Sequence, residues 1–365
     1  MKKSVLALAV ASVLAAPLAA QADTILYGSA RVSVDYVDND NDSDSYWDVM
    51  NNSSRLGVQG SEDLGGGLNA IYQYEFGVDV TEGGSFEGNR PKLVGLKGGF
   101  GTVSLGTQET PYYHVAGIVD IFNTDRSLGT TAFLGGSFNG FKLTVDPDTR
   151  ASDGGSLFRL DNSLYYTTPD FSGFTGELML VMNGAENDNQ GYSNSVDLWN
   201  IAAKYSNGPF FAGASYIKLE GSDNVPISPG IDLDLDLDQW NIGLGYSAGP
   251  FSVGFIYEEG TLNEFGLYSN AKFDGERLFG TDDASNWYLT GEYKFGNNTI
   301  RGAYGQLDTG LSDPGFDDTI DNYLVGYQYD FSRRTRVWVE YIGRSANDAV
   351  YRDQNAFSIG TRVDF

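Results

Sequence analysis

The sequence predicts an all-β protein, and more narrowly a transmembrane antiparallel β-barrel of about 16 strands. Aromatic residues make up 14% of the 365 residues, with 23 Tyr and 22 Phe, yet the mean hydropathy is negative. Many aromatics without a long apolar run indicate strands instead of membrane-spanning helices. Segments that alternate apolar and polar residues recur along the chain, and short connectors between them alternate with long ones.

The first 22 residues, MKKSVLALAVASVLAAPLAAQA, have the pattern of a secretory signal peptide. Two lysines precede a short apolar stretch, and small residues stand at Ala20 and Ala22 before the expected cleavage site. The alternative is an uncleaved anchor helix, but the stretch is short and Pro17 interrupts it. We therefore predict a signal peptide over residues 1–22 and a single barrel domain over residues 23–365.

The last segment, AFSIGTRVDF, shows the alternation to its final residue. Phe357, Ile359 and Val363 fall on one side, whereas Arg362 and Asp364 fall on the other. Such a strand suits a wall between lipid and water. An even number of strands brings both ends of the chain to one side of the membrane. The last strand is then expected to pair with the first, so that no open edge is left in lipid.

The expected strands are separated by two kinds of connector. The strands begin near residues 25, 54, 67, 90, 101, 156, 171, 195, 209, 238, 250, 285, 298, 320, 332 and 355. Short turns with Gly, Asn or Pro are expected near 98–101, 206–210, 247–251, 295–298 and 329–334. Long polar connectors are expected near 37–53, 79–89, 108–155, 183–194, 220–237, 259–284, 309–319 and 345–354. This asymmetry is typical of an outer-membrane barrel, whereas a soluble propeller or solenoid would share only the alternation.

Charge and cysteine content limit the partners. The chain has 23 basic and 49 acidic residues, and the signal peptide holds two of the basic ones, so the mature chain has a net charge of −28. Nucleic acid and anionic membrane surfaces are poor partners for such a protein, whereas cations are better ones. The absence of cysteine excludes a disulfide framework and thiolate chemistry.

Several segments together resemble general bacterial outer-membrane porins of Gram-negative bacteria. They are DTILYGSARVSVDY at 23–36, SRLGVQGSEDLGGGLNAIYQYEFG at 54–77, NRPKLVGLKGGFGTVSLGTQETPYY at 89–113 and RLDNSLYYTTPDFSGF at 159–174. The terminal Phe365 is also typical of the family, where it is expected to serve as the assembly signal. The resemblance implies a sixteen-stranded barrel, usually a homotrimer without cofactors, that passes small hydrophilic solutes and ions by passive diffusion. It also implies that the long third loop, here 108–155, folds into the lumen and narrows it.

The family keeps a basic ladder on the wall opposite its third loop. The residues expected to form it here are Arg31, Arg55, Arg90 and Arg159. Arg55, Arg90 and Arg159 match the motif positions, whereas Arg31 is placed inside by alternation alone. In NRPKLVG, taking Leu93 as lipid-facing places Arg90 and Lys92 inside. The alternative is that these arginines are ordinary solvated charges in a wet lumen.

Acidic residues in the third loop supply the opposite charge. Glu109, Asp120 and Asp125 lie early in the loop, within QETPYYHVAGIVDIFNTD. If the loop folds inward, these carboxylates face the guanidinium groups across a gap and set up a transverse field. The negative total charge, with Thr107 where relatives often carry a basic residue, favours a weak preference for cations.

Two other patterns allow more than one interpretation. IDLDLDLD places Asp232, Asp234, Asp236 and Asp238 at alternate positions, where they could bind divalent ions or bridge them to lipopolysaccharide phosphates. A solvated acidic loop rim is the simpler alternative. The only histidine, His114, lies in the third loop without a nucleophile motif such as G-x-S-x-G, so enzyme chemistry is not expected.

A binding protein remains as an alternative of a different class. An adhesin or a substrate-specific receptor would act through the long acidic loops. A barrel with an open lumen conducts ions in planar bilayers, whereas a pure binding module does not.

Overall fold

The computed structural model describes most of residues 23–365. The described residues are 23–39, 45–84, 86, 88, 90–124, 129–134, 157–182, 196–220, 225–228, 231–233, 237–261, 271–273, 276–277, 284–308, 319–345 and 353–365. The predicted signal peptide over residues 1–22 lies outside this part of the chain.

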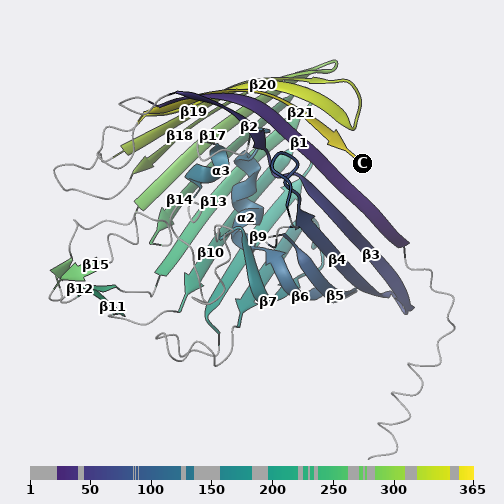
Figure 1. The fold of residues 1–365 in the computed structure, drawn as a ribbon. Coiled ribbons are helices and arrows are strands. Elements are labelled where there is room, and N and C mark those ends of the chain that lie inside the picture. Colours follow the sequence, from purple (N-terminus) through teal and green to yellow (C-terminus); the bar gives the residue numbers. More distant parts are fainter. Residues whose placement is uncertain are drawn as a thin grey trace, which may run out of the picture.

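Within the described residues, sixteen long strands form a closed antiparallel barrel (Figure 1). They are β1 (Asp23–Asn39), β3 (Arg55–Gly65), β4 (Leu68–Gly77), β5 (Lys92–Gly98), β6 (Gly101–Glu109), β7 (Arg159–Thr167), β8 (Phe174–Val181), β9 (Leu198–Asn207), β10 (Phe210–Leu219), β13 (Leu237–Ala248), β14 (Phe251–Gly260), β17 (Ala284–Phe295), β18 (Asn298–Asp308), β19 (Thr319–Asp330), β20 (Thr335–Ser345) and β21 (Gln354–Asp364). Each pairs with the next of these strands along the chain, and β21 pairs with β1. The predicted fold class and strand number are confirmed.

The structure adds strands where the sequence predicted only long connectors. β2 (Tyr46–Asn51) pairs with Val32–Val37 in the C-terminal part of β1. The N-terminal part of β1, Asp23–Ser29, pairs with β3. The residues between β2 and β3 interrupt the pairing along β1, and Ser53 among them has a φ of 60°. The prediction of one connector over 37–53 was therefore wrong, because β1 is long enough to pair with both strands. A separate four-stranded sheet consists of β11 (Val225–Ser228), β12 (Ile231–Leu233), β15 (Ala271–Phe273) and β16 (Glu276–Arg277).

The barrel closes at the last residue. β1 and β21 pair from Ser29 and Asp364 to Asn39 and Gln354. Phe365 extends this ladder, since its N–H and carbonyl oxygen each hydrogen-bond the backbone of Gly28 at 3.0 Å. A side chain on Gly28 would collide with the Phe365 ring, so glycine is needed there for the terminal ring to lie flat on β1. The predicted pairing of the last strand with the first is confirmed.

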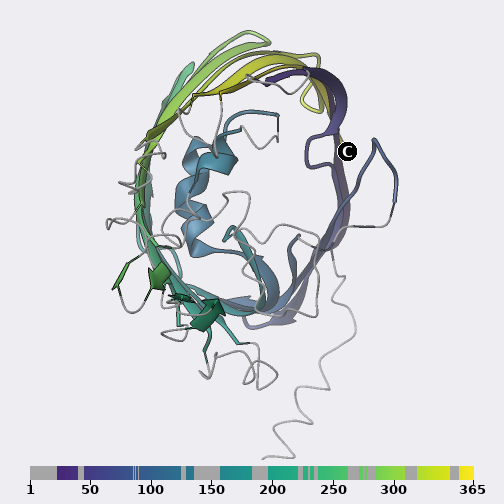
Figure 2. The same cartoon turned by 60° about the vertical axis from the view of Figure 1, so that its left-hand side comes forward.

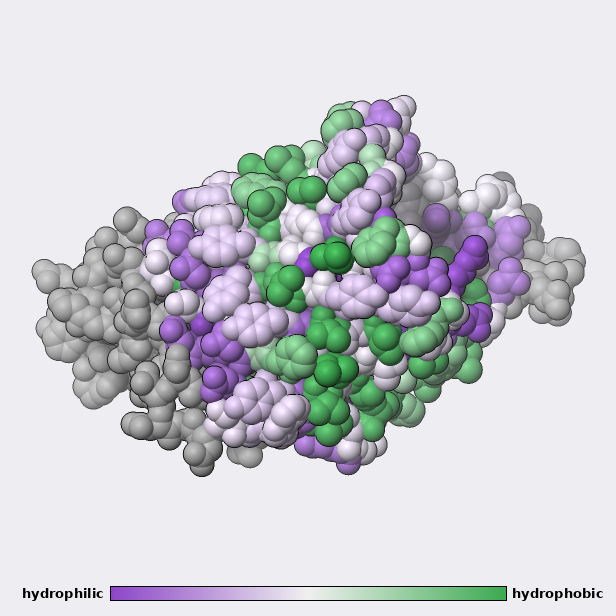
Figure 3. Space-filling model, turned by 90° about the horizontal axis from the view of Figure 1, so that it is seen from above, coloured by the Kyte–Doolittle hydropathy of each residue, from purple (hydrophilic) through white to green (hydrophobic). Residues whose placement is uncertain are grey.

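The distribution of polar residues is the reverse of that in a soluble protein. Exposed aliphatic residues lie on the outer face, among them Leu26, Val94, Val253, Val325 and Ile359. Buried polar residues such as Ser33, Glu75 and Asn200 face inward. Seen from above, a hydrophobic band crosses the surface with hydrophilic residues on both sides (Figure 3). Because lipid favours apolar side chains outside and a closed backbone network, this surface fits a membrane.

Aromatic pairs flank the hydrophobic band. Near the long connectors the neighbouring rings are Tyr36–Trp47, Trp199–Tyr216, Trp240–Tyr257, Trp287–Tyr304 and Tyr323–Tyr341, with ring centres 5.2–6.3 Å apart. Near the short turns they are Phe174–Tyr205, Phe210–Tyr246 and Phe251–Tyr293. Rings at both strand ends are expected where a barrel meets the two membrane–water interfaces.

Three short helices follow β6. They are α2 (Pro111–Ala116), the 3-10 helix η1 (Gly117–Val119) and α3 (Thr130–Phe133). Figure 2 shows α2 inside the ring of strands, beside the teal and green strands and on the opposite side from the purple β1. None of the helices in the described residues is long and apolar enough to cross a membrane.

Candidate functional site

The segment after β6 turns inward at Thr110. The Thr110 hydroxyl accepts a hydrogen bond from the N–H of Tyr113 and donates one to the carbonyl of Leu157. Pro111 occupies the first turn of α2, where its missing N–H costs nothing. These local features end β6 and start a helix, and so direct residues 110–124 across the inner face of the barrel. We call this segment the inner loop.

Tyr112 anchors the start of the inner loop to two strands. Its N–H donates to Asn200 Oδ1 on β9 at 2.7 Å, and its hydroxyl donates to Glu258 Oε2 on β14 at 2.5 Å. Asn286 on β17 donates a further hydrogen bond to the other oxygen of Glu258. Complete burial, with the neighbouring charge of Glu258, raises the pKa of Tyr112 well above its usual value. Tyr112 therefore stays a neutral donor at all physiological pH values.

A second anchor holds the end of the inner loop. Glu340 on β20 accepts hydrogen bonds from the N–H and side-chain amide of Asn123 and from the N–H and hydroxyl of Thr124. Arg301 on β18 lies 3.8 Å from Glu340 and donates at 2.6 Å to the carbonyl of Ile121. These contacts join residues about 200 positions apart in the sequence, and they fix the inner loop to the wall at both ends.

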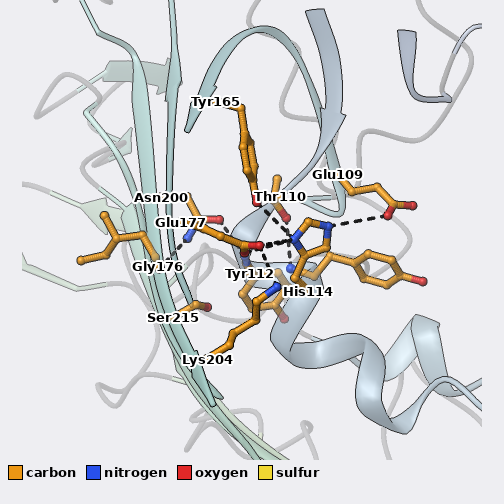
Figure 4. A network of polar contacts seen from close by, with 12 residues as sticks. Glu109, Thr110, Tyr112, His114, Tyr165, Gly176, Glu177, Asn200, Lys204 and Ser215 are labelled. Carbon is orange, nitrogen blue, oxygen red and sulfur yellow. Dashed lines mark hydrogen bonds and ion pairs between the residues drawn. The ribbon is translucent and has the colours of Figure 1, made fainter. Parts of the chain in front are cut away.

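His114 lies between two carboxylates at the start of the inner loop (Figure 4). Its Nδ1 is 3.1 Å from both oxygens of Glu177 on β8, and its Nε2 is 3.8 Å from Glu109 on β6. Tyr165 and Lys204 complete the network: the tyrosine hydroxyl is 3.1 Å from Nδ1, and the lysine donates to Glu177 at 2.7 Å.

The carboxylates determine the charge of His114. Burial lowers the pKa of this histidine, but hydrogen bonds to Glu109 and Glu177 outweigh that effect and raise it to about 9. The charge of Lys204 opposes the rise. His114 is therefore positively charged at neutral pH and helps to hold α2 against β6 and β8.

Arginines line the inner face of the strands at the seam, where β21 pairs with β1 and closes the barrel. Arg336, Arg362 and Arg31 are directly opposite one another on β20, β21 and β1. Asp364 bonds Arg336 at 3.0 Å and Arg362 at 2.7 Å, whereas Arg31 donates to the hydroxyl of Ser29. Register thus places three guanidinium groups in one row across three neighbouring strands.

Arg55 and Arg90 extend this row around the barrel. Both lie near Glu75 on β4, with shortest nitrogen–oxygen distances of 3.7 and 3.6 Å. The Tyr27 hydroxyl also donates to Glu75 at 2.9 Å. We call Arg31, Arg55, Arg90, Arg336 and Arg362 the arginine wall.

The predicted site residues are distributed between the arginine wall and the strands next to the inner loop. Arg31, Arg55 and Arg90 lie together in the arginine wall. Arg159 instead pairs with Glu109 at 3.2 Å, since these two residues are directly opposite on β6 and β7. Glu109 is the last residue of β6, so it stands beside a basic residue and not across a gap from it.

The remaining acidic candidates are placed only in part. Asp120 follows η1 and accepts a hydrogen bond from the Tyr113 hydroxyl at 3.0 Å. Asp125, Asp234 and Asp236 lie outside the described residues. Asp238 on β13 accepts from the Tyr216 hydroxyl at 2.7 Å, and Asp232 belongs to β12. Within the described part of the chain, no group of three or more acidic or histidine side chains could hold a metal ion.

The expected orientation of β5 was wrong. Lys92 is directly opposite the exposed Tyr74, and its ammonium lies 5.1 Å from the centre of the Phe76 ring, so it faces outward. Leu93 is opposite Gln73 and faces inward. Arg90 still reaches the lumen because it precedes the strand, beyond Pro91, where alternation no longer applies.

Sequence reasoning missed several residues of the site. The period-two pattern placed Arg362 on the polar face of its strand without assigning it to the site, and the same pattern puts Arg336 on the face opposite to Val337. No local signal marks Glu258 or Glu340 as anchors, since their partners lie far away in the sequence. The complete site has a loop fixed to one wall and a row of positive charges on another.

Comparisons with known proteins agree with this architecture. A family model described as Gram-negative porin matches residues 7–349. The major outer membrane protein P.IB of Neisseria gonorrhoeae is 30% identical over 357 residues, covering 93% of this chain and 92% of that protein. The P.IB protein of Neisseria lactamica is 27% identical over 379 residues, which span both chains completely.

Solved structures show the same fold. An anion-selective porin from Comamonas acidovorans superposes with a TM-score of 0.71 at 21% identity, covering 94% of this chain and 100% of that one. OmpF of Salmonella typhi, in complex with daunomycin, gives a TM-score of 0.66 at 16% identity, covering 94% and 97%. At these identities the likeness concerns the fold alone.

Proposed function

Because this chain belongs to the Gram-negative porin family of the outer membrane, we propose that it passes small hydrophilic solutes and ions between its inner loop and its arginine wall. The observation that carries this proposal is the arrangement of the lumen. Glu258 and Glu340 anchor the inner loop to one side, whereas the arginine wall lies on the strands around the seam.

The charged groups suit a transverse field. Asp120 on the inner loop is exposed, and the arginine wall has the carboxylates Glu75 and Asp364 beside it. Such a field orients water and polar solutes, whereas an apolar solute loses hydration without compensation. Arginine suits this role because it stays charged at any relevant pH. Arg159 and Glu109 would contribute as a pair at the edge of the passage.

We also propose a weak preference for cations. The arginine wall favours anions locally, but the exposed Asp120 on the inner loop opposes it. The mature chain carries a net charge of −28, and its long connectors are rich in Asp and Glu. Acidic residues at a channel mouth raise the local concentration of cations. The selectivity named for the Comamonas porin does not transfer at 21% identity.

Single-channel recording tests the function directly. Purified protein in planar bilayers should conduct in discrete steps, and a salt gradient should give a small reversal potential of the sign expected for cations. A strong anion preference would contradict the proposed selectivity. Protein that inserts without conducting would contradict the channel itself and favour a binding role for the loops.

Further parts of the proposal concern assembly and partners. We propose that residues 1–22 are removed before Asp23, that three copies assemble in the outer membrane, and that Phe365 is recognised during insertion. The exposed Phe365 ring and its backbone pairing with Gly28 support the last point. Mass spectrometry of the mature N-terminus and crosslinking in detergent test the first two. Deleting Phe365 should reduce assembled protein in membranes.

The aspartates of residues 232–238 remain candidates for divalent ions and lipopolysaccharide phosphates. Calcium titration of Asp232→Asn and Asp238→Asn variants tests this proposal. Unchanged calcium affinity in both would favour a solvated loop rim.

A further inference from the structure

The strands beneath the inner loop carry a patch of glycines. Gly213 on β10 is directly opposite Gly243 on β13, and Gly245 on β13 is directly opposite Gly254 on β14. Opposite residues in an antiparallel pair point to the same side, and residues two apart on one strand share a face. The four glycines therefore form one continuous area on the inner wall, which we call the glycine patch.

The conformation of these strands does not itself require glycine. The residues with φ in the left-handed region include Gly208, Gly249 and Gly260 at strand ends, but no member of the glycine patch. Glycine inside a strand is unfavourable unless another group approaches the backbone closely. A close approach is therefore the physical reason to look for.

The inner loop makes that approach. A methyl group on Gly254 would lie 2.7 Å from the carbonyl oxygen of Ile118, and one on Gly243 would lie 3.0 Å from the carbonyl oxygen of Val115. Both contacts are with loop backbone, which rotating a side chain cannot relieve. On Gly245 the nearest atom would be the end of the Ile118 side chain, at 2.9 Å.

The loop cannot escape such a contact by sliding. Tyr112 and His114 hold it to β9, β14 and β8 on one side, and Asn123 and Thr124 hold it to β20 on the other. Added bulk under Val115 and Ile118 can push the middle of the loop in one direction only, away from the wall. That direction leads into the lumen.

We propose that the glycine patch determines the size limit of the channel by letting the inner loop lie directly on the wall. This inference rests on the proposed function, in which solutes pass the inner loop. The glycines act as positioning residues, since they touch the loop and not the solute. Their replacement narrows the passage, and larger solutes are affected most.

Sugar uptake by vesicles that contain the protein tests the inference. We compare Gly254→Ala with Gly291→Ala, a control on the adjacent strand β17 where a methyl group meets nothing within 4 Å. Swelling rates are measured with arabinose, glucose, sucrose and raffinose. The raffinose-to-arabinose ratio should fall at least about twofold in Gly254→Ala and stay unchanged in Gly291→Ala. An unchanged or increased ratio in Gly254→Ala overturns the proposal.

A rescue experiment separates displacement of the loop from misfolding. On Gly213 a methyl group would meet the Val115 side chain at 3.0 and 3.2 Å, and the end of the Phe211 side chain on the same strand at 3.1 Å. Adding Val115→Ala to Gly213→Ala should therefore restore the wild-type ratio. Adding Ile118→Ala to Gly254→Ala should not, because the carbonyl contact remains. The opposite pattern overturns the proposal even if one variant folds poorly.

The two proposals fail in different ways. Wild-type vesicles that take up no sugar contradict the channel itself. Wild-type uptake together with a Gly254→Ala variant that behaves like Gly291→Ala contradicts only the role of the glycine patch.

Discussion

The two sides of the lumen differ in how deeply their charged residues are buried. The wall under the inner loop carries the glycine patch, and its carboxylates Glu258 and Glu340 are buried in hydrogen bonds to the loop. In the arginine wall Arg90 is buried, whereas the other four arginines are partly open, with Arg55 at 24% and Arg336 at 23% side-chain exposure. Buried charge holds a segment in place, whereas exposed charge acts on what passes.

This difference shows why similar residues have opposite roles in one barrel. A buried carboxylate is costly unless donors surround it, so it fixes the position of those donors. An arginine facing water keeps its hydration and exerts its field over a longer range. The predictions that follow change one wall at a time.

The largest effect is expected at Glu340. Replacing Glu340 with alanine leaves the buried N–H groups of Asn123 and Thr124 without their acceptor, at a cost of about 3 kcal/mol. Arg301 keeps Glu292 as an ion-pair partner. Hydrogen exchange at these two amides should become roughly 100-fold faster. Glu62→Ala, on an exposed part of β3, serves as the control. Slow exchange in the Glu340→Ala variant would show that the anchor is not needed.

A change of the arginine wall should alter selectivity without loosening the inner loop. Arg31→Gln removes a charge whose guanidinium donates a hydrogen bond to the Ser29 hydroxyl. The cation-to-anion permeability ratio, measured from the reversal potential, should rise roughly twofold. Arg334→Gln, at an exposed turn, should leave it unchanged. Equal ratios in both variants would contradict a role for the wall.

The pH dependence of the His114 charge tests how α2 is held on the side of the lumen that the inner loop covers. Its pKa of about 9 exceeds the usual 6.5, so its contribution to holding α2 is complete below pH 6.5 and is lost as pH rises through 9. Because His114 is the only histidine, its ring signal in NMR spectra is unambiguous. The midpoint should lie near 9 and fall in Glu177→Gln. A midpoint at or below 6.5 would contradict the double-carboxylate environment.

The smallest effect is expected at the exposed Lys294, near the end of β17. The Lys294 ammonium lies 2.9 Å from Glu292 and is 61% exposed, and Glu292 also has Arg301 as a partner. Lys294→Ala should therefore change the free energy of unfolding by less than about 1 kcal/mol, measured by urea titration in lipid vesicles. A loss comparable to that in Glu340→Ala would remove the distinction between buried and exposed charge.

Alternation along the chain was enough to predict the barrel. The period of two is a local property, so it identified sixteen strands and the pairing of β21 with β1. It failed at β5, where Pro91 separates Arg90 from the strand and the lipid-facing residue was chosen wrongly. It also missed β2, since a second short strand beside β1 depends on where β3 begins.

The site depended on information that the local pattern does not contain. The sequence by itself determined which residues of a strand share a face, because neighbouring side chains must point to opposite faces. Only the tertiary structure decided that Arg336, Arg362 and Arg31 lie in one row, since register between strands sets their height. It also decided that Ile118 rests on Gly254 and Thr124 on Glu340, because closing the barrel brings these distant residues together.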